Sequence, residues 1–428
     1  MNYLSIAAVS LFLLMSLCGP ARGSGAVSHT DSTISASIDT VQAKPDPTPY
    51  ETTRSFGEHM LAFPSYLFHW ITRPAGWAIK FGERKFPSLF RGERGKTGIF
   101  PLFETGGETG AAYGALFFHR DFTSFHHKIR AEILFGSEEF NDFDLEYTLP
   151  GPFSKPDELE FQGTYYNDPL EALYGANDSE LDNERRFWTE EARGDIVYSS
   201  PLGRQSGMRV QATFRNVTIR QSKFRRDDGP FIPFPDRLKG EFNELRLGTQ
   251  FEIDFTKGVP RNYLGPRFLA GLGYNESVGE QDFRYLDYHF EWQQFVPMPF
   301  LPNTRRLAFR SQVRKVAPLT GEDIPFYNRP SLGSSRDLRG YRGDRFRDDG
   351  SLLLTLEYRY PIWDFADLVL FADEGQVFHD FSDIALDRFH GNYGFGFHAL
   401  GGKGLAFRLE FAFSKEGQRF ILSISPNF

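Results

Sequence analysis

The sequence predicts an all-β fold: a transmembrane antiparallel β-barrel of about 16 strands with a short N-terminal amphipathic helix. Three observations predict this class. Apolar and polar residues alternate with a period of two from about residue 97 to the C-terminus. Phenylalanine, with 46 residues, is the commonest apolar residue, and aromatic residues make up 16% of the chain. Beyond residue 20, no apolar run approaches the roughly 18 residues that a membrane-spanning helix needs.

Charge and cysteine content exclude further classes of protein. The chain has 48 Lys and Arg against 56 Asp and Glu, a net charge of −8. This balance argues against a nucleic-acid partner, because no basic excess is present to neutralise phosphates. The single cysteine, Cys18, precedes the predicted signal-peptide cut, so the mature chain is expected to have neither disulfides nor thiolate metal sites.

The N-terminus is predicted to direct export. Residues 1–23 are typical of a secretory signal peptide, because an apolar stretch that ends at Leu17 is too short to span a bilayer and small residues precede a cut before Ser24. Residues 24–58 are rich in Ser, Thr, Asp and Pro and have few large apolar side chains to bury. They are predicted to form a disordered periplasmic leader.

Residues 59–85 are predicted to form an amphipathic helical segment. Apolar residues recur there at three- and four-residue steps, as in Met60, Phe63, Leu67 and Trp70. Two interpretations stay open at this point. The helix packs into a core, or it lies at the membrane interface or under one mouth of the barrel.

Residues 97–428 are predicted to form the barrel. In residues 405–414 one face is apolar, and the other carries small or charged residues such as Glu410; residues 244–255 show the same division. A soluble sandwich also alternates. These stretches, however, are long enough to cross a bilayer when tilted, and their polar face is charged at mid-strand, as a water-filled lumen permits.

The number of strands and the end of the chain indicate where the barrel is located. An even number of strands puts both ends of the barrel in the periplasm. In the last strand, apolar and polar residues alternate, and the apolar positions resemble the terminal signal of bacterial outer-membrane barrels. These positions are Phe420, Leu422, Ile424 and Phe428. The predicted location is therefore the bacterial outer membrane.

The most informative motif lies in the long connection at about residues 319–350, which contains SSRDLRGYRGDRFRD at 334–348. LLLTLEYRYPI at 352–362 and LFADEGQV at 370–377 follow it. Together these segments closely resemble the BamA/TamA superfamily of outer-membrane barrels, also called the bacterial surface antigen family. The resemblance is strong over residues 330–428 and looser back to residue 101.

The resemblance implies a set of site residues. Arg339, Gly340 and Tyr341 match the tip of the family's sixth extracellular loop, which folds back into the lumen. The family's inward Phe-x-Asp-x-Gly signature is matched by Phe371, Asp373 and Gly375. The family's acidic residue on strand twelve is matched by Glu357.

Strand alternation supports this site independently. Glu357 and Asp373 fall on the polar faces of neighbouring strands, so both can reach one arginine that a loop delivers. A guanidinium group suits this geometry because it is a planar fork of donors. Gly394 and Gly396 are expected to leave room for the loop tip. The competing interpretation, a solvated basic loop, leaves the matching acidic strands unexplained.

No other constellation indicates chemistry. His126 and His127 flank a polar strand face, and the other histidines, including His379, are dispersed without ligand spacing. No nucleophile elbow or Ser/His pair is recognisable. The sequence therefore predicts neither an enzyme nor a cofactor or metal site, and it disfavours an outer-membrane hydrolase.

The resemblance implies a role in outer-membrane assembly or maintenance, by insertion or translocation of protein or lipid. It also implies a weak seam between the first and last strands. The loop would be held in the lumen at Arg339, and this contact is called the loop lock. The family's periplasmic POTRA modules are not expected, because the segment before residue 97 is too short for one. The expected partners are outer-membrane lipid and a periplasmic protein or client barrel. The alternative function is a passive or gated pore for small solutes.

Overall fold

The computed structural model describes residues 96–107, 110–123, 126–154, 156–174, 184–224, 232–256, 264–279, 281–297, 305–319, 323–363, 366–400 and 405–424. The predicted signal peptide, leader and amphipathic helix, and Phe428, lie outside these residues. Within them, no helix combines the length and the apolar character that a membrane crossing requires.

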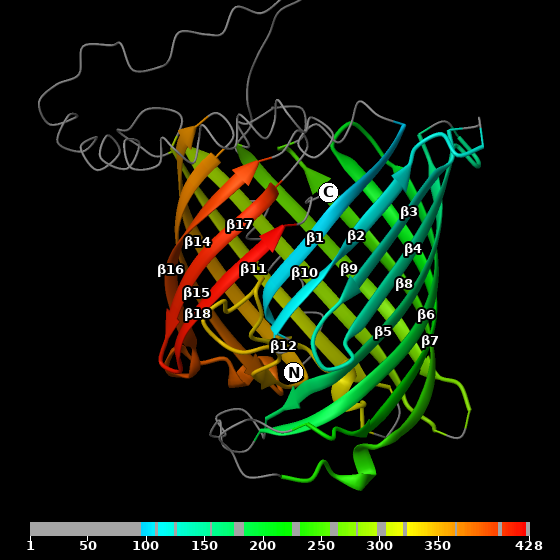
Figure 1. Ribbon diagram of the computed structural model, residues 1–428, viewed down its shortest axis with the longest axis vertical. Helices are drawn as coiled ribbons and strands as arrows, with labels where there is room; N and C mark the ends of the chain where they lie inside the picture. Colours follow the sequence, from blue (N-terminus) through cyan, green and yellow to red (C-terminus); the bar gives the residue numbers. More distant parts are fainter. Residues whose placement is uncertain are drawn as a thin grey trace, which may run out of the picture. The chain divides into compact units, whose positions relative to one another are not determined.

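Sixteen antiparallel strands of the described chain form a closed barrel (Figure 1), which confirms the predicted fold class. Consecutive barrel strands are neighbours, and β1 meets β18. The barrel strands are β1 (Thr97–Gly107), β2 (Gly110–His119), β3 (Lys128–Phe135), β4 (Asn141–Pro150), β5 (Glu158–Leu173), β6 (Arg185–Pro201), β7 (Ser206–Gln221), β8 (Gly240–Asp254), β9 (Gly265–Ser277), β10 (Arg284–Pro297), β11 (Arg306–Pro318), β14 (Gly350–Trp363), β15 (Ala366–Phe378), β16 (His390–Leu400), β17 (Leu405–Ser414) and β18 (Gly417–Ile424).

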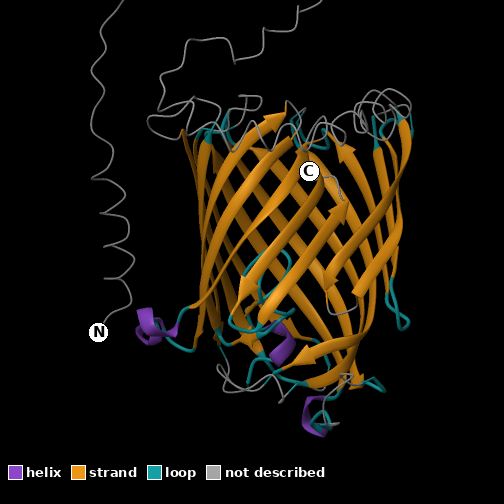
Figure 2. Ribbon diagram, turned by 60° about the vertical axis from the view of Figure 1, so that its left-hand side comes forward, coloured by secondary structure: helices purple, strands orange, loops and turns teal. Residues whose placement is uncertain are grey.

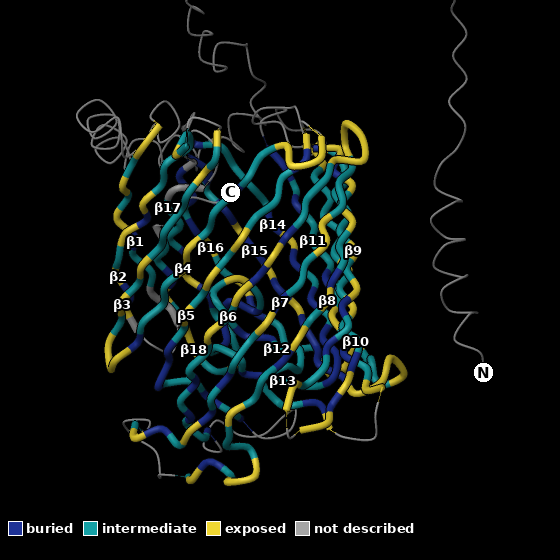
Figure 3. The backbone as a smooth tube through the Cα atoms, turned by 90° about the vertical axis from the view of Figure 1, so that its right-hand side faces the viewer, coloured by how far each residue is buried: buried dark blue, intermediate teal, exposed yellow. Residues whose placement is uncertain are grey.

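The two faces of the strands differ as the alternation predicts. Along β14, Leu356 is 50% exposed, whereas its neighbours Thr355 and Glu357 are each only 8% exposed. An exposed leucine between two buried polar residues reverses the arrangement of a soluble protein. The outer surface therefore faces lipid, and the polar residues line the interior. Figure 3 shows exposed and more buried positions alternating along the strands.

The connection between β11 and β14 lies partly inside the barrel, where Figure 2 shows a loop enclosed by strands. It contains η3 (Phe326–Asn328) and the paired short strands β12 (Ser331–Leu332) and β13 (Phe346–Arg347). Apolar residues of this loop pack on β14 and β15 to form a buried cluster of Leu332, Leu338, Tyr341, Phe346, Leu353 and Val377. The loop is therefore packed against the wall.

Short 3-10 helices occur in two other connections. η2 (Asp236–Leu238) lies between β7 and β8, and η4 (Phe381–Asp383) and η5 (Leu386–Arg388) lie between β15 and β16. Antiparallel order puts these connections at the same rim as residues 319–349. Connections at the opposite rim include the short segment 202–205. Since outer-membrane barrels have long extracellular loops and short periplasmic turns, the rim with residues 319–349 is the extracellular one.

The seam between β1 and β18 has the shortest pairing in the described barrel. Its register joins Phe103 to Ile424 and Glu104 to Ser423. In contrast, β1 and β2 are paired continuously from Thr97, opposite His119, to Thr105. Among the described residues, two residue pairs therefore join β1 to β18.

We expect Leu356→Arg to destabilise the barrel by about 2–4 kcal/mol, which is the cost of an arginine that faces lipid near the bilayer midplane. Urea unfolding in lipid vesicles, followed by tryptophan fluorescence, measures this loss. The matched control is Leu386→Arg, since Leu386 in the extracellular connection is 92% exposed. Its effect should stay within about 0.5 kcal/mol, and equal losses would contradict a lipid-facing Leu356.

Candidate functional site

The site centres on Arg339, which the loop carries into the barrel and which is only 4% exposed. Its Nε and Nη2 donate to the two carboxylate oxygens of Asp373 on β15, at 2.9 and 2.8 Å. Its Nη1 donates to Glu357 on β14 and to Glu410 on β17, each at 2.9 Å. One guanidinium group thus joins the loop to three strands, and the contact with Asp373 is bidentate.

An aromatic ring supports the guanidinium group from one side. The Cζ atom of Arg339 lies 3.6 Å from the centroid of the Phe371 ring, which is close enough for a cation–π interaction. Phe371 is on the same face of β15 as Asp373, so the strand supplies both contacts. A Cβ atom at Gly394 on β16 would overlap the Phe371 ring. Glycine at this position is therefore required for the ring to lie beneath Arg339.

The loop tip approaches the wall closely at the two residues that follow Arg339. A Cβ atom at Gly340 would lie 2.7 Å from Cβ of Asn392 and 2.9 Å from Cβ of Ser414. The Ser414 hydroxyl donates to the Gly340 carbonyl at 2.8 Å, and the Tyr341 hydroxyl donates to the Gly391 carbonyl at 3.1 Å. These contacts leave no space for a side chain at residue 340.

Two glycine assignments differ from the expectation. Gly394 and Gly396 were expected to make room for the loop tip, but Gly394 accommodates Phe371 and a Cβ at Gly396 would lie 2.7 Å from Cγ of Glu410. Gly375 receives the loop instead: a Cβ there would lie 2.9 Å from Cδ1 of Leu332 and 3.1 Å from Cδ1 of Leu338. Strand parity identifies an inward glycine, but it does not show which side chain lies against that glycine.

The charge cluster also contains residues that were not predicted from the sequence. Glu410 is completely buried, and its Oε1 also lies 2.9 Å from Nε2 of His398. Asp373 accepts a third side-chain hydrogen bond from Asn392 at 2.9 Å, and Arg359 donates to Glu357 at 2.7 and 2.9 Å. The polar face of residues 405–414 was the one available signal for Glu410.

The cluster is nearly balanced in charge. Three carboxylates, those of Glu357, Asp373 and Glu410, face Arg339, and Arg359 neutralises a second negative charge. Arg408 lies 3.8 Å from Glu410, which provides a third positive charge. Mutual pairing of this kind offsets the cost of removing the charged groups from water.

Three residues of the predicted terminal signal, Phe420, Leu422 and Ile424, belong to β18, and Phe428 lies outside the described residues. Phe420 on β18 is 46% exposed, and its ring lies 5.1 Å from that of Phe411 on β17. Ile424 pairs with Phe103 at the seam, and Leu422 lies opposite Leu409. Phe420 thus contributes to the lipid-facing aromatic surface.

We expect Asp373→Asn to destabilise the barrel by about 3 kcal/mol, because it removes the charge that Arg339 contacts through two atoms and leaves a buried cation underpaired. Urea unfolding in lipid vesicles measures the change. Glu374→Gln is the control, since Glu374 is the next residue of β15 and is exposed. Equal stability of the two variants would show that the ion pair does not hold the loop.

Comparisons with known proteins place the fold. No curated protein matches the chain. Among solved structures, BamA from Haemophilus ducreyi, lacking POTRA domains 1–3, is similar with a TM-score of 0.56 and 14% identity, over 78% of this chain and 71% of that one.

Two further structures are similar at a lower level, both with TM-scores of 0.49. CdiB from Acinetobacter baumannii is 14% identical over 77% of this chain and 60% of that one. CdiB from Escherichia coli is 10% identical over 77% and 62%.

The family assignment follows from the sequence match. The model of the Omp85 superfamily domain matches residues 127–425, which is more than half of the chain. This match confirms the resemblance that the loop motif and the following strands indicate. The chain belongs to the Omp85 superfamily, and its barrel is a bacterial outer-membrane barrel.

Proposed function

We propose that the chain acts in the assembly or maintenance of the outer membrane, by inserting or translocating protein or lipid at the seam between β1 and β18. The observation that carries this proposal is the short pairing of the described seam, Phe103 with Ile424 and Glu104 with Ser423, where the neighbouring strand pairs of the described chain run longer. Unpaired edge groups can accept a strand from another chain. A client strand can therefore add to either edge once the seam opens.

The Arg339 cluster supports this mechanism from one side of the seam. Arg339 joins the loop to β14, β15 and β17, and β17 is the partner of β18. In the proposed mechanism these contacts keep the wall rigid up to the penultimate strand, so that movement is confined to the seam. The loop acts as a lock on barrel shape.

The proposed role involves outer-membrane lipid and a client barrel or a periplasmic partner, and it uses no catalytic chemistry. A passive or gated pore is the second candidate, because charged residues such as Arg310 and Glu291 line the interior. The loop that carries Arg339 packs against that interior wall, and we therefore expect little steady current through the barrel in planar bilayers.

We expect a disulfide across the seam to abolish the function without unfolding the barrel. Glu104 and Ser423 are directly opposite, and Cα atoms of such pairs lie about 4.5–5.5 Å apart, within disulfide range. The double variant Glu104→Cys with Ser423→Cys, oxidised in cells that depend on this chain, should raise outer-membrane permeability to large antibiotics. A reductant should restore the barrier.

The control shares one of the two substitutions. Glu104 also lies opposite Ala112 on β2, so Glu104→Cys with Ala112→Cys ties β1 to a strand from which it need not separate. This variant should keep the wild-type barrier. A functional seam-crosslinked barrel, or an open conductance that is unchanged by the crosslink, would favour the pore and overturn the proposal.

A further inference from the structure

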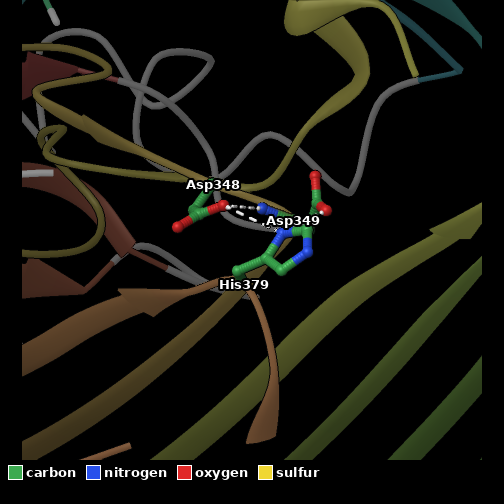
Figure 4. Close-up of side chains that lie close together, drawn as sticks. All are labelled: Asp348, Asp349 and His379. Carbon is green, nitrogen blue, oxygen red and sulfur yellow. Dashed lines mark hydrogen bonds and ion pairs between the residues drawn. The ribbon is translucent and has the colours of Figure 1, made fainter. Parts of the chain in front are cut away.

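A mixed group of carboxylates and an imidazole lies at the extracellular rim, away from the Arg339 cluster. Asp348 and Asp349 directly precede β14, and His379 directly follows β15. Figure 4 shows the three side chains converging on one point. In the described part of the chain, this is the one group of three or more such side chains whose ligand atoms could hold a metal ion.

The distances fit a small coordination sphere. Nδ1 of His379 lies 2.8 Å from Oδ2 of Asp349 and 3.9 Å from Oδ1 of Asp348, and the three ligand atoms all lie within 4.8 Å of one another. Metal bonds of about 2.0–2.2 Å separate neighbouring ligand atoms by about 3–3.5 Å. The observed distances between ligand atoms, 2.8 and 3.9 Å, lie on either side of this separation. Small rotations of the side chains would therefore bring the ligand atoms to the spacing that a metal ion requires.

A second observation separates this group from an ordinary surface ion pair. Asp349 is only 6% exposed, and its buried Oδ1 has no hydrogen-bond partner. Among the described residues, the cation that faces this oxygen is Arg329, with Nη1 at 3.4 Å. Burying a carboxylate oxygen without a hydrogen bond is costly. A cation bound through Oδ2 would add positive charge beside this buried carboxylate, whose other oxygen faces Arg329.

The backbone around the group is held in place. The Asp349 carbonyl accepts from the Val316 amide at 2.7 Å, and the Asp348 amide donates to the Pro330 carbonyl at 3.2 Å. The His379 carbonyl accepts from Nζ of Lys315 at 2.7 Å. The ligands therefore start from a preorganised frame, while the His379 side chain, 69% exposed, leaves room for water at the remaining positions.

We propose that Asp348, Asp349 and His379 bind one divalent transition-metal ion, with Zn²⁺ as the best match to an imidazole and two carboxylates. The ion ties the start of β14 to the end of β15. These two strands carry Glu357 and Asp373, which hold Arg339. Metal binding at the rim therefore braces the wall to which the loop is locked. The site itself does not depend on the function proposed above.

The test uses the full mature barrel, treated with a chelator and titrated with ZnCl₂ by isothermal calorimetry. We expect one saturable site and a higher unfolding temperature with Zn²⁺. His379→Ala should weaken binding at least about tenfold, because losing a metal ligand costs no less than losing an outer-shell partner. The same variant should lose the Zn²⁺-dependent rise in unfolding temperature.

A matched control is His126→Ala. The His126 side chain is 84% exposed, and its Nδ1 lies 3.5 Å from one carboxylate, that of Asp121, so it is a surface histidine beside a single acid. This variant should bind Zn²⁺ as the wild type does. No saturable binding, unchanged affinity in His379→Ala, or equal competition by Ca²⁺, which prefers oxygen ligands, would each overturn the proposal.

Discussion

The buried guanidinium group of Arg339 is the interaction on which the interior of the barrel depends. A charge removed from water is costly unless carboxylates and hydrogen bonds replace the water. Here the replacement comes from Asp373, Glu357 and Glu410 on three different strands. The cost is therefore offset only while the loop and these strands keep their relative positions, which couples the loop to the shape of the wall.

The glycines around Arg339 follow from the same constraint. Arg339 reaches its partners because the chain at Gly340 lies against Asn392 and Ser414, and because the Phe371 ring occupies the space that Gly394 leaves. Each position is closer to its neighbour than a Cβ atom allows. In a packed interior such contacts have few alternatives, since a displaced loop would leave both a cavity and an unpaired charge.

Among the described residues, the seam between β1 and β18 is held less tightly than the packed interior around Arg339. In lipid, each backbone group without a hydrogen-bond partner costs several kcal/mol, which is why barrels close. The described pairing of β1 with β18 is short, whereas β18 pairs with β17 from Gly417, opposite Ser414, to Ser423, opposite Arg408. Among the described residues, opening between β1 and β18 therefore breaks fewer ladder pairs than opening between β18 and β17. In the function proposed above, a firmly held wall beside this short described pairing would let the movement concentrate at the seam.

Local patterning was sufficient for the fold class, the number of strands and the inward direction of Glu357 and Asp373. Side-chain parity along a strand is a local property, so it can be read without knowing which strands meet. The contacts of Glu410 with Arg339 and His398, the neighbours of each inward glycine, and the meeting of Asp349 with His379 required the closed barrel. These contacts depend on the stagger between strands and on how deeply the loop enters, and both are set by closure of the whole sheet.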